Sequence, residues 1–177
     1  LNWLKKNPKD AGAWFDLVYL YQTNLKKYNE AENAYLKAIE FNKRDCVAWN
    51  NLGNVYQLNL KDYEKAKIAY LKSIEIDKSY SYPWNNLGNL YQDYLKEYEK
   101  AETAYLNSIE LVNNDFNAWN GLSNLYQNHL QRYDKAETAY LKSIEINPNN
   151  LHQWNSLGNL YLDHLQEYKK AENAFLN

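Results

Sequence analysis

The sequence predicts an all-α fold built from a row of antiparallel helix pairs. Three observations lead to this prediction. The same residue types return every 35 positions along the chain. Within one period the apolar residues recur three, four and seven positions apart, which places them on one side of a helix. A break in that pattern divides each period into two helices. The period is clearest in the tryptophans, namely Trp14, Trp49, Trp84, Trp119 and Trp154.

The first helix of each repeat carries the Trp on its buried side. In the second repeat, Trp49, Leu52 and Tyr56 fall at i, i+3 and i+7, as expected for one face of a helix. Short polar residues precede this helix in each repeat. Their side chains can accept hydrogen bonds from the unpaired N–H groups of the first turn. These residues are Asp10, Asp45, Asp115 and Asn150, with Ser79 or Ser81 expected to replace them in the third repeat.

The second helix follows a tight turn near 60–62 and carries Tyr63, Ala66, Tyr70 and Ile74 at i, i+3, i+7 and i+11. A single pair of this length cannot close a core, so each pair is expected to stack on the next. The predicted repeats span 10–44, 45–79, 80–114, 115–149 and a truncated 150–177, with 1–9 as the end of a preceding repeat.

The motif Trp-x2-Leu-Gly-x2-Tyr, followed by Ala-x3-Tyr, resembles the tetratricopeptide repeat (TPR) family. "WNNLGNVY" (49–56) and "AKIAYLKSI" (66–74) show the resemblance best, and it extends over essentially the whole chain. It implies a right-handed superhelical solenoid. The repeat is one residue longer than is usual for the family, with the extra residue between Tyr56 and Ala66. Val18 and Ser123 replace the motif glycine.

Carboxamide side chains form a second stripe beside the apolar one. On a helical wheel Asn50, Asn54 and Gln57 lie next to the buried side of the first helix. The resemblance implies that this face lines a concave groove for extended peptides, and that Asn51 and Asn86 occupy a further groove position. A carboxamide offers one acceptor and two donors, which can match a peptide main chain. The predicted peptide-binding residues, called the amide stripe below, are Asn50, Asn51, Asn54, Gln57, Asn85, Asn86, Asn89, Gln92, Asn120, Asn124, Gln127, Asn155 and Asn159.

A structural interpretation of the amide stripe stays open at this point. Asn and Gln beside a core can simply bond to neighbouring helices or to water. Repeats also arise by duplication, so identical positions can reflect shared origin. A sequence from an AT-rich genome would favour Asn codons as well.

Composition argues against several classes of function. The net charge is −2 and no basic face stands out, so a nucleic-acid partner has no electrostatic support. No apolar run approaches the roughly 18 residues needed to span a membrane. Cys46 is the only cysteine, which excludes an internal disulfide. The sequence does not determine the cellular compartment of the protein. A lone cysteine weakly favours the cytoplasm, although many secreted proteins also lack disulfides.

No motif for catalysis, a metal or a cofactor stands out. His129 and His164 occupy equivalent positions but lack further ligands at metal-binding spacing. We therefore expect a non-catalytic scaffold that binds an extended peptide or protein segment. Two alternatives stay open: a regulatory or sensor solenoid of a larger signalling enzyme whose catalytic residues lie elsewhere, or a self-assembly element. End-to-end association is expected to bring Trp3 and Leu4 against the face around Tyr168 and Phe175.

Overall fold

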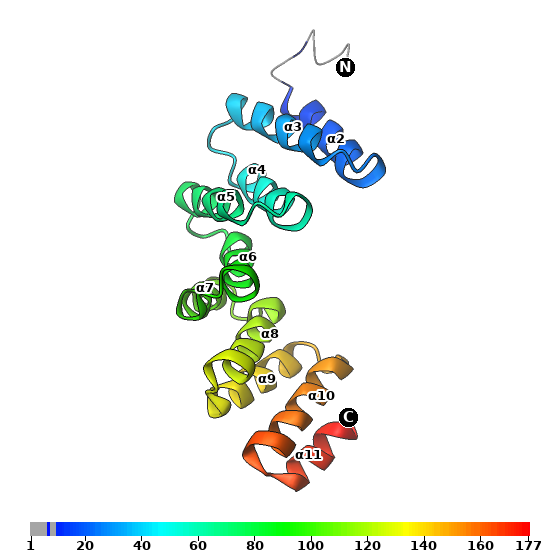
Figure 1. Ribbon diagram of the computed structural model, residues 1–177, viewed down its shortest axis with the longest axis vertical. Coiled ribbons are helices and arrows are strands. Elements are labelled where there is room, and N and C mark those ends of the chain that lie inside the picture. Colours follow the sequence, from blue (N-terminus) through cyan, green and yellow to red (C-terminus); the bar gives the residue numbers. More distant parts are fainter. Residues whose placement is uncertain (1–6, 8–9) are drawn as a thin grey trace. The chain divides into compact units, whose positions relative to one another are not determined.

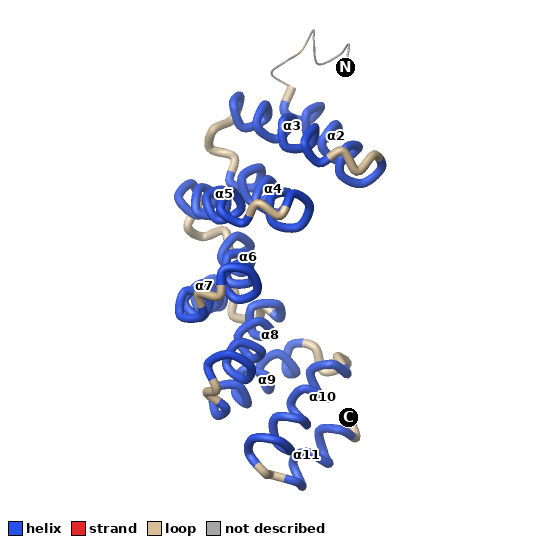
Figure 2. Tube along the Cα trace, viewed as in Figure 1, coloured by secondary structure: helices blue, strands red, loops and turns tan. Residues whose placement is uncertain are grey.

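The computed structural model describes Asn7 and residues 10–177, and these residues form helices and short connections with no strand among them (Figures 1 and 2). The predicted all-α class is therefore confirmed. The chain divides into two compact units, an N-terminal unit of residues 1–86 and a C-terminal unit of residues 87–177.

Each repeat contains a first helix that ends in a π-helical segment, a tight turn and a second helix. In the N-terminal unit the elements are α2 (Ala11–Tyr19), η1 (Leu20–Asn24), α3 (Tyr28–Phe41), α4 (Cys46–Asn54), η2 (Val55–Leu60) and α5 (Tyr63–Ile76), followed by α6 (Tyr82–Leu90), which crosses the boundary. In the C-terminal unit they are η3 (Tyr91–Leu95), α7 (Tyr98–Leu111), α8 (Phe116–Leu125), η4 (Tyr126–Leu130), α9 (Tyr133–Ile146), α10 (Leu151–Asn159), η5 (Leu160–Leu165) and α11 (Tyr168–Phe175).

Side chains cap the first helix of four repeats as the sequence predicts, whereas the cap expected from Ser79 or Ser81 in the third repeat stays a prediction. Asp10 accepts a hydrogen bond from the N–H of Ala13 at 3.0 Å, and Asp45 accepts one from Ala48 at 2.9 Å. Asp115 and Asn150 each accept from two N–H groups of the first turn. These bonds satisfy donors that have no partner inside the helix, and so fix where each helix begins.

The turn after the first helix explains the unusual repeat length. In the second repeat the N–H of Lys61 donates to the carbonyl of Tyr56, five residues earlier. Lys61 itself has a φ of 59°, in the left-handed region. A π-type turn uses one more residue than an α-helical turn, and this accounts for the extra residue between Tyr56 and Ala66. The same left-handed conformation recurs at Lys26, Lys96, Gln131 and Gln166.

The core of each unit is built from second-helix tyrosines that pack against first-helix glycines. Tyr70 is fully buried, and a Cβ on Gly53 would come within 2.5 Å of its ring. A Cβ on Gly88 would likewise come within 2.6 Å of the Tyr105 ring, so the glycine leaves room for this tyrosine. In the first repeat Val18 stands at the glycine position and is buried.

The expected end-to-end association stays a prediction. Tyr168 is 65% exposed and Phe175 is 44% exposed. Trp3 and Leu4 lie outside the described residues, as does most of the expected preceding repeat, residues 1–9.

Candidate functional site: the amide stripe

The structure places the amide stripe along the first helices, with a wide range of burial. Asn50 and Gln57 are buried, at 4% and 6% exposure, whereas Asn155 and Asn159 are exposed. The other members are half-buried: Asn51, Asn54, Asn85, Asn86, Asn89, Gln92, Asn120, Asn124 and Gln127.

Within a repeat, the second-helix tyrosine reaches the stripe with its hydroxyl. The hydroxyl oxygen of Tyr70 lies 2.8 Å from Asn54 Oδ1 and 2.7 Å from Gln57 Oε1. The contact recurs in the third and fourth repeats. Tyr105 lies 2.7 Å from Asn89 and 3.3 Å from Gln92, and Tyr140 lies 3.0 Å from Asn124 and 2.6 Å from Gln127.

The chemistry of a phenol constrains these amides further. A hydroxyl carries one proton, so it can donate to only one of two carbonyl oxygens. The second amide can instead turn its NH₂ group toward the hydroxyl, which then accepts. The hydroxyl of Tyr140 also has the Ser123 and Ser156 side chains as hydrogen-bond partners.

Amides of successive repeats also bond to one another inside each unit. In the N-terminal unit, Asn86 Nδ2 donates to Asn50 Oδ1 at 3.0 Å and to Asn54 Oδ1 at 3.2 Å. In the C-terminal unit, Gln153 Nε2 donates to Asn120 Oδ1 at 2.6 Å. Part of the stripe is therefore engaged within the protein, as the structural interpretation anticipates.

Asn85 is the exception within the stripe. Its Oδ1 is buried, and no group among the described residues lies within hydrogen-bonding distance of it. Buried amide oxygens nearly always have a partner, but the orientation of this amide is not fixed by any hydrogen bond of its oxygen to the described residues.

Sequence reasoning missed two kinds of participant. The sequence places the second-helix tyrosines in the core with hydroxyls that reach the surface or a partner, but it does not identify the amide stripe as that partner. It also does not mark Gln153, which is buried and bonds to both Asn120 and Ser143. A signal for the tyrosines was present. The fifth repeat has Phe175 at the tyrosine position and Leu162 at the position of Gln57, so the hydroxyl and the glutamine are lost together.

Carboxylate clusters join successive repeats on another face. In the C-terminal unit, Glu102 accepts hydrogen bonds from the hydroxyl of Tyr126 at 2.8 Å, from Arg132 at 2.6 Å and from Lys135 at 3.3 Å. Burial raises the pKa of Glu102, but the three hydrogen bonds outweigh it and hold that pKa below its ordinary value. Glu32 and Glu137 occupy equivalent positions and accept from Tyr56 and Tyr161.

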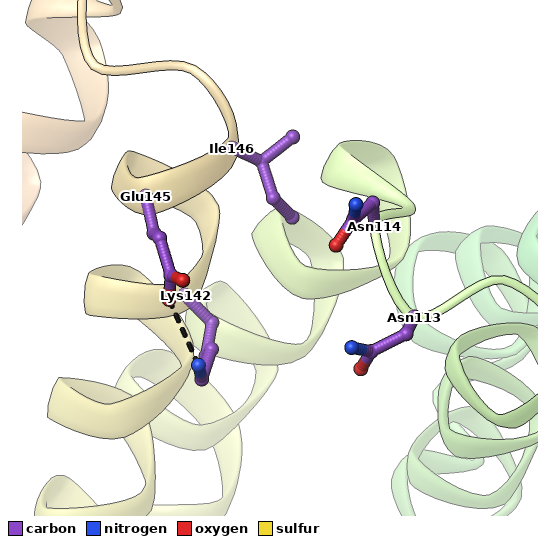
Figure 3. Close-up of a pocket in the computed structure, with 5 residues that line it drawn as sticks. All are labelled: Asn113, Asn114, Lys142, Glu145 and Ile146. Atoms are coloured by element: carbon purple, nitrogen blue, oxygen red, sulfur yellow. Dashed lines mark hydrogen bonds and ion pairs between the residues drawn. The ribbon is translucent and has the colours of Figure 1, made fainter.

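The crevices of the surface lie away from the amide stripe. One of 260 Å³ is lined by Asn113, Asn114, Lys142, Glu145 and Ile146. In Figure 3 the Lys142–Glu145 ion pair stands on α9, opposite the two asparagines of the α7–α8 connection. A second crevice, of 410 Å³, lies between α3 and α5 of the N-terminal unit. Neither contains a stripe residue.

The histidines pack against tyrosines. The His129 ring stacks on Tyr98 with centroids 4.4 Å apart, and His164 stacks on Tyr133 at 4.3 Å. Among the described residues no group of three or more His, Cys, Asp or Glu side chains is arranged to hold a metal ion. The same part of the chain has no helix both long enough and apolar enough to cross a membrane.

Comparison with known families settles the identity of the repeat. Two models described as tetratricopeptide repeat match the sequence, one over 34–68 and 69–103 and the other over 11–45 and 116–150. The chain belongs to the tetratricopeptide repeat family. A search of curated proteins found no match to this TPR chain.

Solved TPR structures resemble the chain in fold. The crystal structure of MamA gives a TM-score of 0.81 at 22% identity, over 90% of this chain and 91% of MamA. YrrB, described as a TPR protein with an unusual peptide-binding site, gives 0.74 at 21% identity, over 98% of this chain and 87% of YrrB. PilF of Pseudomonas aeruginosa gives 0.79 at 20% identity, over 94% of this chain and 75% of PilF. At these identities the likeness concerns the fold.

Proposed function

We propose that this TPR chain is a non-catalytic scaffold that binds an extended protein segment along the amide stripe. Membership of the TPR family supports a role in protein interaction, and the structural neighbour YrrB is described as binding peptides. The segment runs across successive first helices within a unit. Its main chain supplies the N–H and C=O groups that the amides bind.

The absence of charge from the stripe indicates what kind of ligand fits. Every member is Asn or Gln, so no side chain of the stripe neutralises a phosphate or a terminal carboxylate. A charged group buried there would lose its hydration without gaining an ion pair. The fitting ligand is an internal segment with neutral side chains, and salt has little effect on its affinity.

The observation that best supports the proposal is the unpartnered Oδ1 of Asn85. A structural role within the protein explains the amides that form hydrogen bonds with tyrosines or with neighbouring amides. It does not explain a buried acceptor with no partner among the described residues. Rotation of the Asn85 amide brings this oxygen to the surface, where a main-chain N–H of a bound segment would satisfy it.

The test uses Asn85→Ala and a peptide selected from a display library on the wild-type chain. Loss of one neutral hydrogen bond is expected to weaken binding about 5- to 10-fold, because such a bond contributes about 1 kcal/mol. The melting temperature should not fall, since the substitution breaks no side-chain hydrogen bond among the described residues.

A matched control is Asn117→Ala, an exposed asparagine of α8 outside the stripe, which should leave affinity unchanged. Equal affinity of the wild type and Asn85→Ala, measured by calorimetry, would contradict the proposed site. Failure to select any peptide on the wild-type chain would argue against the function itself.

A further inference from the structure

We propose that Tyr70, Tyr105 and Tyr140 are positioning residues for the amide stripe. Each hydroxyl holds the Asn and Gln beside it in one orientation before a ligand binds. The NH₂ groups of Asn124 and Gln92 are bonded to Asn120 and Asp93, and Gln57 is buried, so the ligand meets the remaining amides, Asn54, Asn89 and Gln127. This inference rests on the proposed function for its consequence in binding, but not for its effect on the amides. The amides concerned are Asn54 and Gln57, Asn89 and Gln92, and Asn124 and Gln127.

The tyrosine rings are buried and closely packed. Tyr70 and Tyr105 are fully buried and Tyr140 is 1% exposed. The Tyr105 ring lies between two glycines of the C-terminal unit, because a Cβ on Gly88 or on Gly121 would come within 2.6 Å of it. A ring held in this way keeps its hydroxyl at one point on the first helix.

An amide that touches this point cannot rotate freely. The terminal torsion of an Asn or Gln is broad when nothing restrains it. A hydroxyl bound to one end of the amide selects one of its two orientations. Ordering a side chain on binding costs about 0.5 to 1.5 kcal/mol, and an amide already held in place avoids that cost.

The repeats of the chain act as natural variants of this contact. The first four have a tyrosine together with a glutamine, and in the first Tyr35 lies 3.4 Å from Gln22. The fifth has Phe175 and Leu162 instead, and its remaining amide, Asn159, is exposed. Glutamine is present where the hydroxyl is present and absent where it is absent.

A purely structural role for these tyrosines would require fewer hydrogen-bond partners for each hydroxyl than are observed. One partner is enough to satisfy the donor of a buried phenol. Each of the three hydroxyls instead contacts two amides, and both belong to the face that the stripe occupies. Two amides held at one hydroxyl keep a fixed arrangement of donors and acceptors, which a peptide unit can match.

The experiment replaces the hydroxyls with Tyr70→Phe, Tyr105→Phe and Tyr140→Phe, singly and together. Phenylalanine is tolerated at this position, because the fifth repeat has it. Nuclear magnetic resonance of the side-chain NH₂ groups reports the orientation directly. In each single variant the two NH₂ signals of the affected repeat should shift toward free-amide values and exchange faster with water.

Tyr126→Phe is the matched control. Its hydroxyl binds Glu102 and not the stripe, so the variant removes a phenol of similar burial and should leave the NH₂ signals in place. The triple variant should bind the display-selected peptide at least 10-fold more weakly, while Tyr126→Phe should bind it as the wild type does.

Two results would overturn the inference. The first is unchanged NH₂ signals in the Tyr→Phe variants. The second is a triple variant that loses stability but binds the peptide with wild-type affinity, which would make the hydroxyls internal supports only. If no peptide is selected on the wild-type chain, the proposed function fails, and the NH₂ signals alone decide whether the tyrosines orient the amides.

Discussion

The backbone N–H of Asp62 donates to the carbonyl oxygen of Tyr56 across 2.9 Å and closes the turn between the two helices of the second repeat. The residue inside this turn is Lys61, whose backbone is left-handed. Non-glycine residues are strained in that conformation, by about 1 to 2 kcal/mol. The same bond closes the turns at Lys27–Tyr21, Glu97–Tyr91, Arg132–Tyr126 and Glu167–Tyr161.

Replacing Lys61 with glycine should stabilise the protein. Glycine adopts the left-handed conformation without the steric penalty, although it gains more entropy in the unfolded chain. The net expectation is an increase of about 0.5 to 1 kcal/mol in the free energy of unfolding. Urea denaturation measures it. Lys61→Ala removes the same side chain but keeps the strain, so an equal gain in both variants would assign the effect to the lysine side chain instead.

The helices and their caps could be predicted because their causes are local. The spacing of Trp49, Leu52 and Tyr56 defines one side of a helix, and Asp45 caps it from the adjacent residue. The sequence also locates the extra residue correctly, between Tyr56 and Ala66. Its π-helical form was not predicted, because no side chain marks a five-residue backbone bond.

The arrangement of the amide stripe could be predicted only in part. A helical wheel locates Asn54 and Gln57 beside the core, but it does not show which atoms of another helix reach them. The contact with Tyr70 joins residues 16 and 13 positions apart across a turn. The only sequence signal for this contact is the paired change to Phe175 and Leu162 in the fifth repeat.

Glu102→Gln should destabilise the protein at neutral pH by about 1 to 2 kcal/mol, because hydrogen bonds to a charged group contribute more than neutral ones. The pKa of Glu102 is lowered in the folded state, so its contribution is present above the unfolded pKa, about 4.3. It is lost as the pH falls through the folded value. The difference between wild type and variant should therefore be constant above about pH 5 and shrink in more acidic solution.

Urea titrations at several pH values measure this difference. Glu99→Gln is the control, because Glu99 is exposed on the same helix α7 and should show little effect at any pH. A difference for Glu102→Gln that persists undiminished at pH 3 would mean that the negative charge of Glu102 is not what stabilises the cluster.

Gly88→Ala should destabilise the C-terminal unit. The added Cβ would lie 2.6 Å from the ring of Tyr105, which also packs closely against Gly121. Overpacking of this kind costs about 1 to 3 kcal/mol, which exceeds the helix-propensity gain of about 1 kcal/mol from removing a glycine. Thermal unfolding measures the net loss. At Gly12 the nearest atom is Asp10 Oδ1 at 3.3 Å, so Gly12→Ala should be close to neutral.

Alkaline titration should separate the tyrosines into two classes. Burial raises the pKa of Tyr140 to about 12, above the ordinary value near 10. A group whose pKa is raised on folding stabilises the folded state below its unfolded pKa, and this contribution is lost as the pH rises through the folded value. Stability should thus decline between about pH 10 and pH 12.

Ultraviolet difference spectra follow the ionisation, and circular dichroism follows unfolding in the same samples. The other class is exposed and includes Tyr19 and Tyr82, whose rings already contact water. The buried class should ionise only together with unfolding, because a phenolate of Tyr140 would be buried and could no longer donate to the stripe amides. Tyr140→Phe removes one group whose ionisation favours unfolding. The variant should therefore lose less of its free energy of unfolding between neutral and alkaline pH than the wild type does. Ionisation of all tyrosines near pH 10 without loss of helix would show that the second-helix hydroxyls are open to solvent, and the contacts with the amide stripe would then be absent in solution.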